Sequence, residues 1–226
     1  MRLPAAWPLS RVALDAAVLT ATLAFAAAVA FIPGQGPVAL IYFLIARLAY
    51  VSYASVELRA QSLRLGLEAP EVAESRHAAF NRRVLRLQNT DAIAFASLCI
   101  ATRSTLPWDE WEPVFFGIGV VLIVVGFGSK AWAVRCLGPS SYTWHDFFVP
   151  KKHFEPCRSG PYRFFKDPMY TLGYLQAYGV ALIADSWYGL AAALFAQASI
   201  LLVNELVEKP HFRRLCGAVV KPAESP

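Results

Sequence analysis

Two short segments near the C-terminal end place charged side chains beside long apolar runs. The segment "VNELVEKPHFRRLCG" carries Glu205 and Glu208, and a spacing of three puts both carboxylates on one face of a helix. The segment "RSGPYRFFKDPMYTLG" carries Arg163 and Lys166 just before another apolar run. Carboxylates at the end of an apolar helix are costly unless a cation meets them. Together the segments predict an anion site opposite a cation site, which suits a zwitterionic amino acid group.

The second segment also contains a signal for the start of a helix. Asp167 is a good N-cap residue and Pro168 suits the first helical position, so we expect a span to begin here. The free N–H groups and positive dipole end of that helix would strengthen the anion site. The alternative is that the cations only reach into the headgroup layer, beside an aromatic belt of Tyr162, Phe164 and Phe165.

The composition indicates which elements must position these groups. Hydrophobic residues make up 57% of the 226 residues and charged residues only 16%, which is typical of a membrane protein. The long apolar runs predict an all-α integral membrane protein with about six transmembrane helices. Spans are expected at residues 12–32, 38–56, 113–134, 168–184 and 187–204, with a weaker one near 92–107. A short turn at Asp185 and Ser186 brings the charged segments to the same depth.

The distribution of Lys and Arg predicts how the spans are oriented. With six spans, one side receives basic groups within residues 2–11, 59–86, 135–166 and 209–221. The positive-inside rule makes this side cytoplasmic, with both termini and the predicted site there. On the same side, the segment 57–90 is expected to form an amphipathic helix lying on the anionic leaflet, and the alternative is a solvated connector.

The two charged segments resemble the membrane-embedded S-adenosylmethionine-dependent methyltransferases, the superfamily of phosphatidylethanolamine N-methyltransferases and isoprenylcysteine carboxyl methyltransferases. In that pattern a Gly-Pro-[Tyr/Phe]-Arg, a basic-His-Pro-x-Tyr-x-x-Gly and a late Glu-Glu-x-x-Leu-x-x-x-x-Gly surround the methyl donor. This chain departs from the pattern at Asp167, which replaces the histidine, and at Lys209, which replaces the second glutamate. The resemblance covers roughly residues 120–217 and implies a methyltransferase core in 113–217. No linker or internal repeat separates a second domain, so we expect one membrane domain over residues 1–226, with N-terminal helices of unassigned role in 1–112.

The resemblance also implies which residues bind the cofactor S-adenosylmethionine. They are Gly126, Gly128, Tyr162, Arg163, Lys166, Pro168, Met169, Tyr170, Gly173, Glu205, Glu208 and His211. Close helix packing is the alternative explanation for the Gly-x-Gly at residues 126–128. The segment "YTWHDFF" that follows is similar to a cluster found in the phospholipid branch of the superfamily.

The reaction that the resemblance implies is methyl transfer to the amine of phosphatidylethanolamine or its methylated derivatives. The protein must align the methyl donor and acceptor, exclude water and keep the amine neutral. His145, Asp146 or Glu205 could remove the ammonium proton, directly or through water. The expected partner is a membrane phospholipid, with no nucleic acid. The alternatives are a prenylcysteine carboxyl methyltransferase, a nicotinamide-dependent sterol reductase and a non-enzymatic scaffold or transporter subunit.

The cysteines indicate a reduced compartment. Three of the four, Cys136, Cys157 and Cys216, fall on the predicted cytosolic face and show no CxxC spacing. The sequence therefore predicts neither a disulfide framework nor a metal site.

Overall fold

The computed structural model describes the chain except for residues 1–8, 108, 139–141, 150–156, 158 and 220–226. Its long helices are α1 (Leu9–Phe31), α2 (Gly36–Arg64), α3 (Pro70–Ala101), α4 (Glu112–Leu137) and α7 (Trp187–Val203). Shorter helices are α6 (Leu175–Ile183) and α8 (Lys209–Val219). The described residues are all helical or irregular, which agrees with the all-α prediction. Lys151, Lys152 and Arg158, counted in the predicted basic face, lie outside the described residues.

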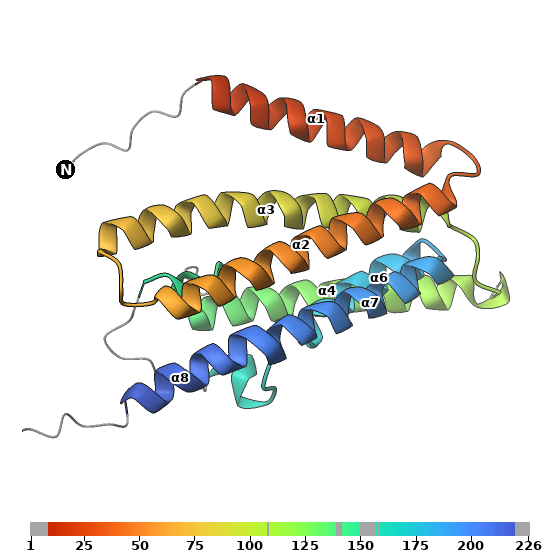
Figure 1. The fold of residues 1–226 in the computed structure, drawn as a ribbon. Helices are drawn as coiled ribbons and strands as arrows, with labels where there is room; N and C mark the ends of the chain where they lie inside the picture. Colours follow the sequence, from red (N-terminus) through yellow and green to blue (C-terminus); the bar gives the residue numbers. More distant parts are fainter. Residues whose placement is uncertain (1–8, 108, 139–141, 150–156, 158, 220–226) are drawn as a thin grey trace, which may run out of the picture.

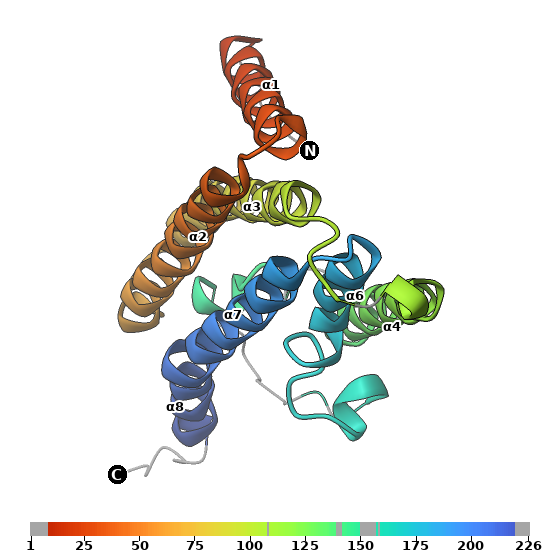
Figure 2. The same cartoon turned by 90° about the vertical axis from the view of Figure 1, so that its right-hand side faces the viewer.

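Among the described residues, three helices are long and apolar enough to cross a membrane: Gly36–Arg64, Glu112–Leu137 and Trp187–Leu215. Two shorter apolar helices, Ala16–Phe31 and Leu172–Ile183, correspond to the first and fifth predicted spans. In Figure 1 these helices run roughly parallel, and in Figure 2 α1 lies at the edge of the bundle beside α2 and α3, away from α4 and α6.

The structure corrects the prediction for residues 57–107. The expected leaflet-bound helix and the weak span are one continuous helix, α3, and α2 extends to Arg64. The apolar face of the predicted surface helix is covered by protein, because Phe80 and Val84 are 3% and 1% exposed in the core. Val72, which was expected on that face, is 47% exposed.

The helix predicted to begin at Pro168 begins later. Residues 168–171 form a turn whose first hydrogen bonds run from the N–H groups of Tyr170 and Thr171 to the Asp167 carbonyl. A short 3-10 segment, Leu172–Tyr174, follows, and α6 starts at Leu175. The prediction that Asp167 caps a helix beginning at Pro168 is therefore wrong. The tight connection to α7, residues 184–186, is confirmed.

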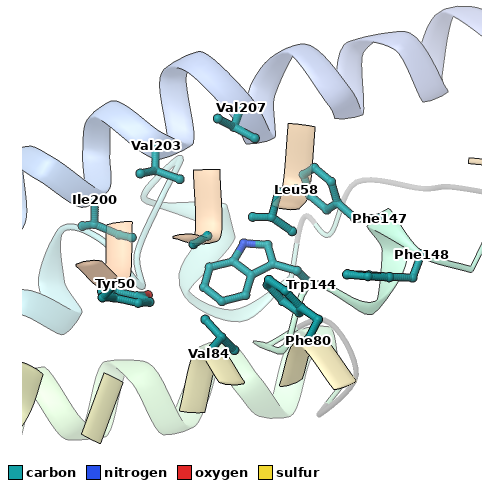
Figure 3. Close-up of a cluster of buried hydrophobic side chains, with 11 residues drawn as sticks. Tyr50, Leu58, Phe80, Val84, Trp144, Phe147, Phe148, Ile200, Val203 and Val207 are labelled. Carbon is teal, nitrogen blue, oxygen red and sulfur yellow. The ribbon is translucent and has the colours of Figure 1, made fainter. Parts of the chain in front are cut away.

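A cluster of buried side chains joins α2, α3, α7 and the segment 142–149 at one end of the bundle. Trp144 lies in its middle, between Val84 and Phe80 of α3 and the apolar side chains of α2 and α7 (Figure 3). The same end, on the left in Figure 1, receives the end of α2, the start of α3, the end of α4 and all of α8. The two charged segments, which contain Asp167 and Lys209, meet here.

Candidate active site

Glu208 is a buried carboxylate at this end of the bundle. It is 7% exposed, accepts a 2.6 Å hydrogen bond from the Tyr170 hydroxyl, and accepts another from the Trp144 indole. Both partners are neutral, and no ion pair found among the described residues involves Glu208. A buried carboxylate without a cation is costly. Glu208 is thus a buried acid that is held only by neutral hydrogen-bond donors.

A π-helical turn, Asn204–Glu208, sets the direction of this carboxylate. Such turns are rare, and they often occur at functional sites because they redirect side chains. Asn204 and Glu208 are buried on the same side, while the side chain of Glu205 is 55% exposed. The prediction that Glu205 and Glu208 share one face is thus wrong, since the wider turn separates them.

Lys209 belongs to a separate, outer set of charges. Its ammonium group lies 3.2 Å from an Asp167 oxygen and also pairs with the Glu205 carboxylate four residues before it. The contact between Lys209 and Asp167 joins the segment 159–173 to the start of α8, which confirms that the two charged segments lie at the same depth in the bundle. Glu205 is thus an exposed residue that forms an ion pair with Lys209.

The segment 142–149 covers Glu208 from the other side. Trp144 has a left-handed backbone conformation with φ of 54°, which is strained for a bulky residue. The neighbouring Phe147 ring stacks on the His211 ring at 3.8 Å, and His211 Nδ1 lies 2.9 Å from Ser62 Oγ of α2. Strain of this kind persists only where the surroundings enforce it, and here it points the indole N–H at Glu208.

Tyr170 is held on its backbone side by α7. The Gln197 amide donates to the Tyr170 carbonyl at 3.1 Å, and its oxygen accepts a 2.8 Å bond from the Tyr178 hydroxyl. Burial and the nearby Glu208 carboxylate raise the pKa of Tyr170 well above its usual value. The phenol therefore stays protonated and remains a hydrogen-bond donor to Glu208.

The predicted Gly-x-Gly does not act as a unit. A Cβ on Gly126 would collide with the backbone of Gln176, so this glycine allows α4 and α6 to pack closely. Gly128 is exposed, with nothing within 4 Å of a Cβ placed there. Gly173 is buried against the side chain of Lys130. Of these three glycines, Gly173 lies nearest in sequence to the Tyr170–Glu208 pair.

The other predicted site residues fall into two groups. Pro168 is buried and Met169 and Tyr162 are half-buried, whereas Arg163 and Lys166 are exposed. Burial raises the pKa of Tyr162, so it too stays protonated.

The three candidate proton acceptors lie in different surroundings. Asp146 is 7% exposed and lies two residues after Trp144, whose indole binds Glu208. His145 instead faces α3, with Nε2 3.2 Å from a Glu74 oxygen. Glu205 is the surface residue that pairs with Lys209.

The sequence did not predict a place in the site for three polar residues, which are Asn204, Lys130 and Trp144. Asn204 is buried, and its Nδ2 has no hydrogen-bond partner among the described residues. Lys130 lies in an apolar span with its Nζ 5.4 Å from the centre of the Tyr174 ring. An ionisable residue in such a span is itself a functional signal that could have found Lys130. Only the structure identifies Trp144 as a partner of Glu208.

Comparison with known proteins covers this part of the chain. Residues 114–218 match the phospholipid methyltransferase family. A phosphatidylethanolamine N-methyltransferase of Malassezia globosa is 34% identical over 130 residues, which is 57% of this chain and 13% of that protein. Proteins of the same name from Clavispora lusitaniae and Saccharomyces cerevisiae are 35% and 30% identical over 44% and 54% of this chain, and 12% and 14% of their own length.

The chain thus spans only about an eighth of the length of these relatives, and no solved structure matches it. The family match nevertheless contains both charged segments, the glycines of α4, and every residue of the Tyr170–Trp144–Glu208 cluster. Residues 114–218 of this chain belong to the phospholipid methyltransferase family.

Proposed function

We propose that this protein transfers methyl groups from S-adenosylmethionine to the amine of phosphatidylethanolamine or its methylated derivatives. The observation that carries the proposal is the buried Glu208 carboxylate, which is held by two neutral hydrogen-bond donors and takes part in no ion pair found among the described residues. The family match and the names of the fungal relatives support the choice of reaction.

The residues around Glu208 fit the amino acid part of the methyl donor. Glu208 would accept hydrogen bonds from its ammonium group, and a charge-assisted bond of this kind is strong when partly desolvated. Asn204 Nδ2, four residues earlier on the same side, is a buried hydrogen-bond donor available to the donor's carboxylate. Tyr170 and Trp144 fix the Glu208 carboxylate, and Phe147 and His211 exclude water beside it.

The chemistry requires little covalent help from the protein. When bound, S-adenosylmethionine would supply an electrophilic methyl group on a sulfonium. Once its own proton has been removed, the lipid amine would form a bond to that methyl carbon, the carbon–sulfur bond would break, and the sulfur would leave as a neutral thioether. Of the three candidate proton acceptors, we assign this role to Asp146. It is 7% exposed and lies two residues after Trp144, whereas the Glu205 side chain is 55% exposed at the surface and His145 faces Glu74 of α3. The protein therefore contributes alignment, dehydration and one proton acceptor.

We further propose that the site faces the cytosol. The helix ends that meet at Glu208 are the ends that carry Arg64, Arg135 and the basic residues of α8, and the positive-inside rule makes such an end cytoplasmic. A water-soluble methyl donor and a leaflet-bound acceptor can meet at that depth.

The test uses the full chain reconstituted into vesicles that contain phosphatidylethanolamine, with isotopically labelled S-adenosylmethionine outside and inside. Mass spectrometry of the lipids should detect mono-, di- or trimethylated phosphatidylethanolamine. At limiting methyl donor, Glu208→Gln should lower the rate by about one to two orders of magnitude, the loss of a charge-assisted bond of about 1.5–3 kcal/mol. Glu112→Gln, an exposed acid at the opposite end of the bundle, is the matched control. A parallel reaction offers a prenylcysteine substrate together with the phospholipid. If the labelled methyl group appeared on the prenylcysteine and not on the phospholipid, the assignment of phosphatidylethanolamine as the acceptor would be overturned.

A further inference from the structure

A second polar cluster lies on the outer side of the segment 142–149. It consists of Glu74 and His77 of α3 and His145 of the segment, and these three residues offer ligand atoms that all lie within 4.8 Å of one another. His145 Nε2 is 3.2 and 3.3 Å from the two Glu74 oxygens. The rings of His77 and His145 meet edge to face, with centroids 4.7 Å apart.

The orientation of His77 favours metal binding over a simple histidine–carboxylate pair. Its Nε2 lies 3.1 Å from the Thr143 carbonyl oxygen, so Nε2–H donates there and Nδ1 keeps its lone pair. A histidine that binds a metal commonly donates its other ring N–H to a carbonyl in this way, which fixes the ring.

The kind of ion follows from the ligands. Two imidazoles and one carboxylate form a set that binds zinc in proteins, with the fourth position taken by water or another ligand. Nitrogen ligands disfavour Mg²⁺ and Ca²⁺, which prefer oxygen. The side chains are 56% exposed for Glu74 and 21% for His145, so an ion can enter from solvent.

We propose that Glu74, His77 and His145 bind a divalent transition metal, with zinc the best fit, and that this ion fastens the segment 142–149 to α3. Glu74 and His77 are three residues apart on one rigid helix, and His145 comes from a segment 68 residues farther along the chain. The ion would therefore act as a cross-link between two parts of the fold.

This cross-link has a consequence for Glu208. Trp144 directly precedes His145, adopts the strained φ of 54° and donates to the Glu208 carboxylate. Holding His145 against α3 would stabilise the backbone conformation that points the indole at Glu208. The metal would be a positioning element outside the chemistry, and its binding can be measured whether or not the protein methylates lipid.

The experiment is a titration of the purified, chelator-treated full chain with Zn²⁺ by calorimetry and with Co²⁺ by absorption. To remove competing thiolates, Cys136, Cys157 and Cys216 are first replaced by serine. We expect one ion to bind per chain with low-micromolar or tighter affinity. The metal affinity should fall by at least about 100-fold in His77→Gln and in His145→Gln, because removing a ligand costs at least as much as removing a group that orients one. Glu71→Gln, an exposed acid in the first turn of α3, is the control and should bind normally.

A second readout separates the cross-link from a local defect. Hydrogen exchange of peptides that contain residues 142–149 should slow on addition of Zn²⁺ in the parent protein and stay unchanged in His77→Gln. Exchange in α7 should be equal in both, which reports that the variant is folded. The proposal is overturned by the absence of stoichiometric binding, by equal binding in the parent and the histidine variants, or by exchange in 142–149 that Zn²⁺ does not alter.

Discussion

Arg47 is the centre of a buried polar network that joins α2 to α3, α7 and the 3-10 segment Leu172–Tyr174. It is 2% exposed, and its guanidinium donates to Asp91 Oδ2 at 2.8 Å, to Ser199 Oγ at 2.9 Å and to the Tyr174 hydroxyl at 2.7 Å. It also donates to the carbonyl of Ala196. Replacing it tests whether this network holds the helices that carry the site.

The variant Arg47→Met removes the charge and keeps an apolar side chain of useful size. It leaves the Asp91 carboxylate buried without a cation, and Asp91 Oδ1 already has no hydrogen-bond partner among the described residues. Removing one partner of a buried ion pair costs about 3–5 kcal/mol. For a chain of 226 residues this corresponds to a fall of about 6–20 °C in the unfolding midpoint, at about 2–4 °C per kcal/mol.

The assay is thermal unfolding in a mild detergent, followed by tryptophan fluorescence, of Arg47→Met, Asp91→Leu and the double variant. Because the double variant removes both charges, it should lose less stability than the sum of the single variants. Two results would refute the view that Arg47 and Asp91 form a coupled buried pair. One is a fall of under about 2 °C in the unfolding midpoint of Arg47→Met, and the other is a double variant whose loss equals the sum of the single variants.

Further predictions concern the site and the topology. Tyr170→Phe should weaken methyl-donor affinity about tenfold, the contribution of one hydrogen bond to the Glu208 carboxylate, and unchanged calorimetric affinity would contradict this. Asp146→Asn should lower kcat by about 100-fold or more with methyl-donor affinity retained, whereas a normal kcat would exclude Asp146 as the proton acceptor. Gly160→Ala should destabilise the fold by about 1–3 kcal/mol in thermal unfolding, because φ is +58° and a Cβ would strike a cysteine of α4; a stability equal to the parent's would be inconsistent with this geometry. A reporter fused after Pro226 should be cytosolic, and an external signal would reverse the proposed orientation.

The sequence predicted the parts of the site that depend on charge in an apolar setting. Glu208 stood out because a carboxylate at the end of an apolar span needs a reason to be there. The short turn at 184–186 then predicted correctly that the 158–173 segment lies at the same depth, as the Lys209–Asp167 ion pair confirms. These inferences needed only helix length and charge.

The sequence was less informative where tertiary contacts decide the structure. The break predicted between a surface helix and a span does not exist, because Phe80 and Val84 find a protein core that makes a single long α3 stable. The separation of Glu205 from Glu208 follows from a π-helical turn, for which sequence spacing gives no signal. The Trp144–Glu208 bond depends on a strained backbone that only the packed segment enforces.

The central claim is that Glu208 binds the ammonium group of S-adenosylmethionine. Calorimetric titration of S-adenosylmethionine into the purified full chain, Glu208→Gln and Glu112→Gln tests it most directly. We predict that Glu208→Gln binds about one to two orders of magnitude more weakly than the parent, and that Glu112→Gln binds normally. Equal affinity of Glu208→Gln and the parent would contradict the account and remove Glu208 from the methyl-donor site.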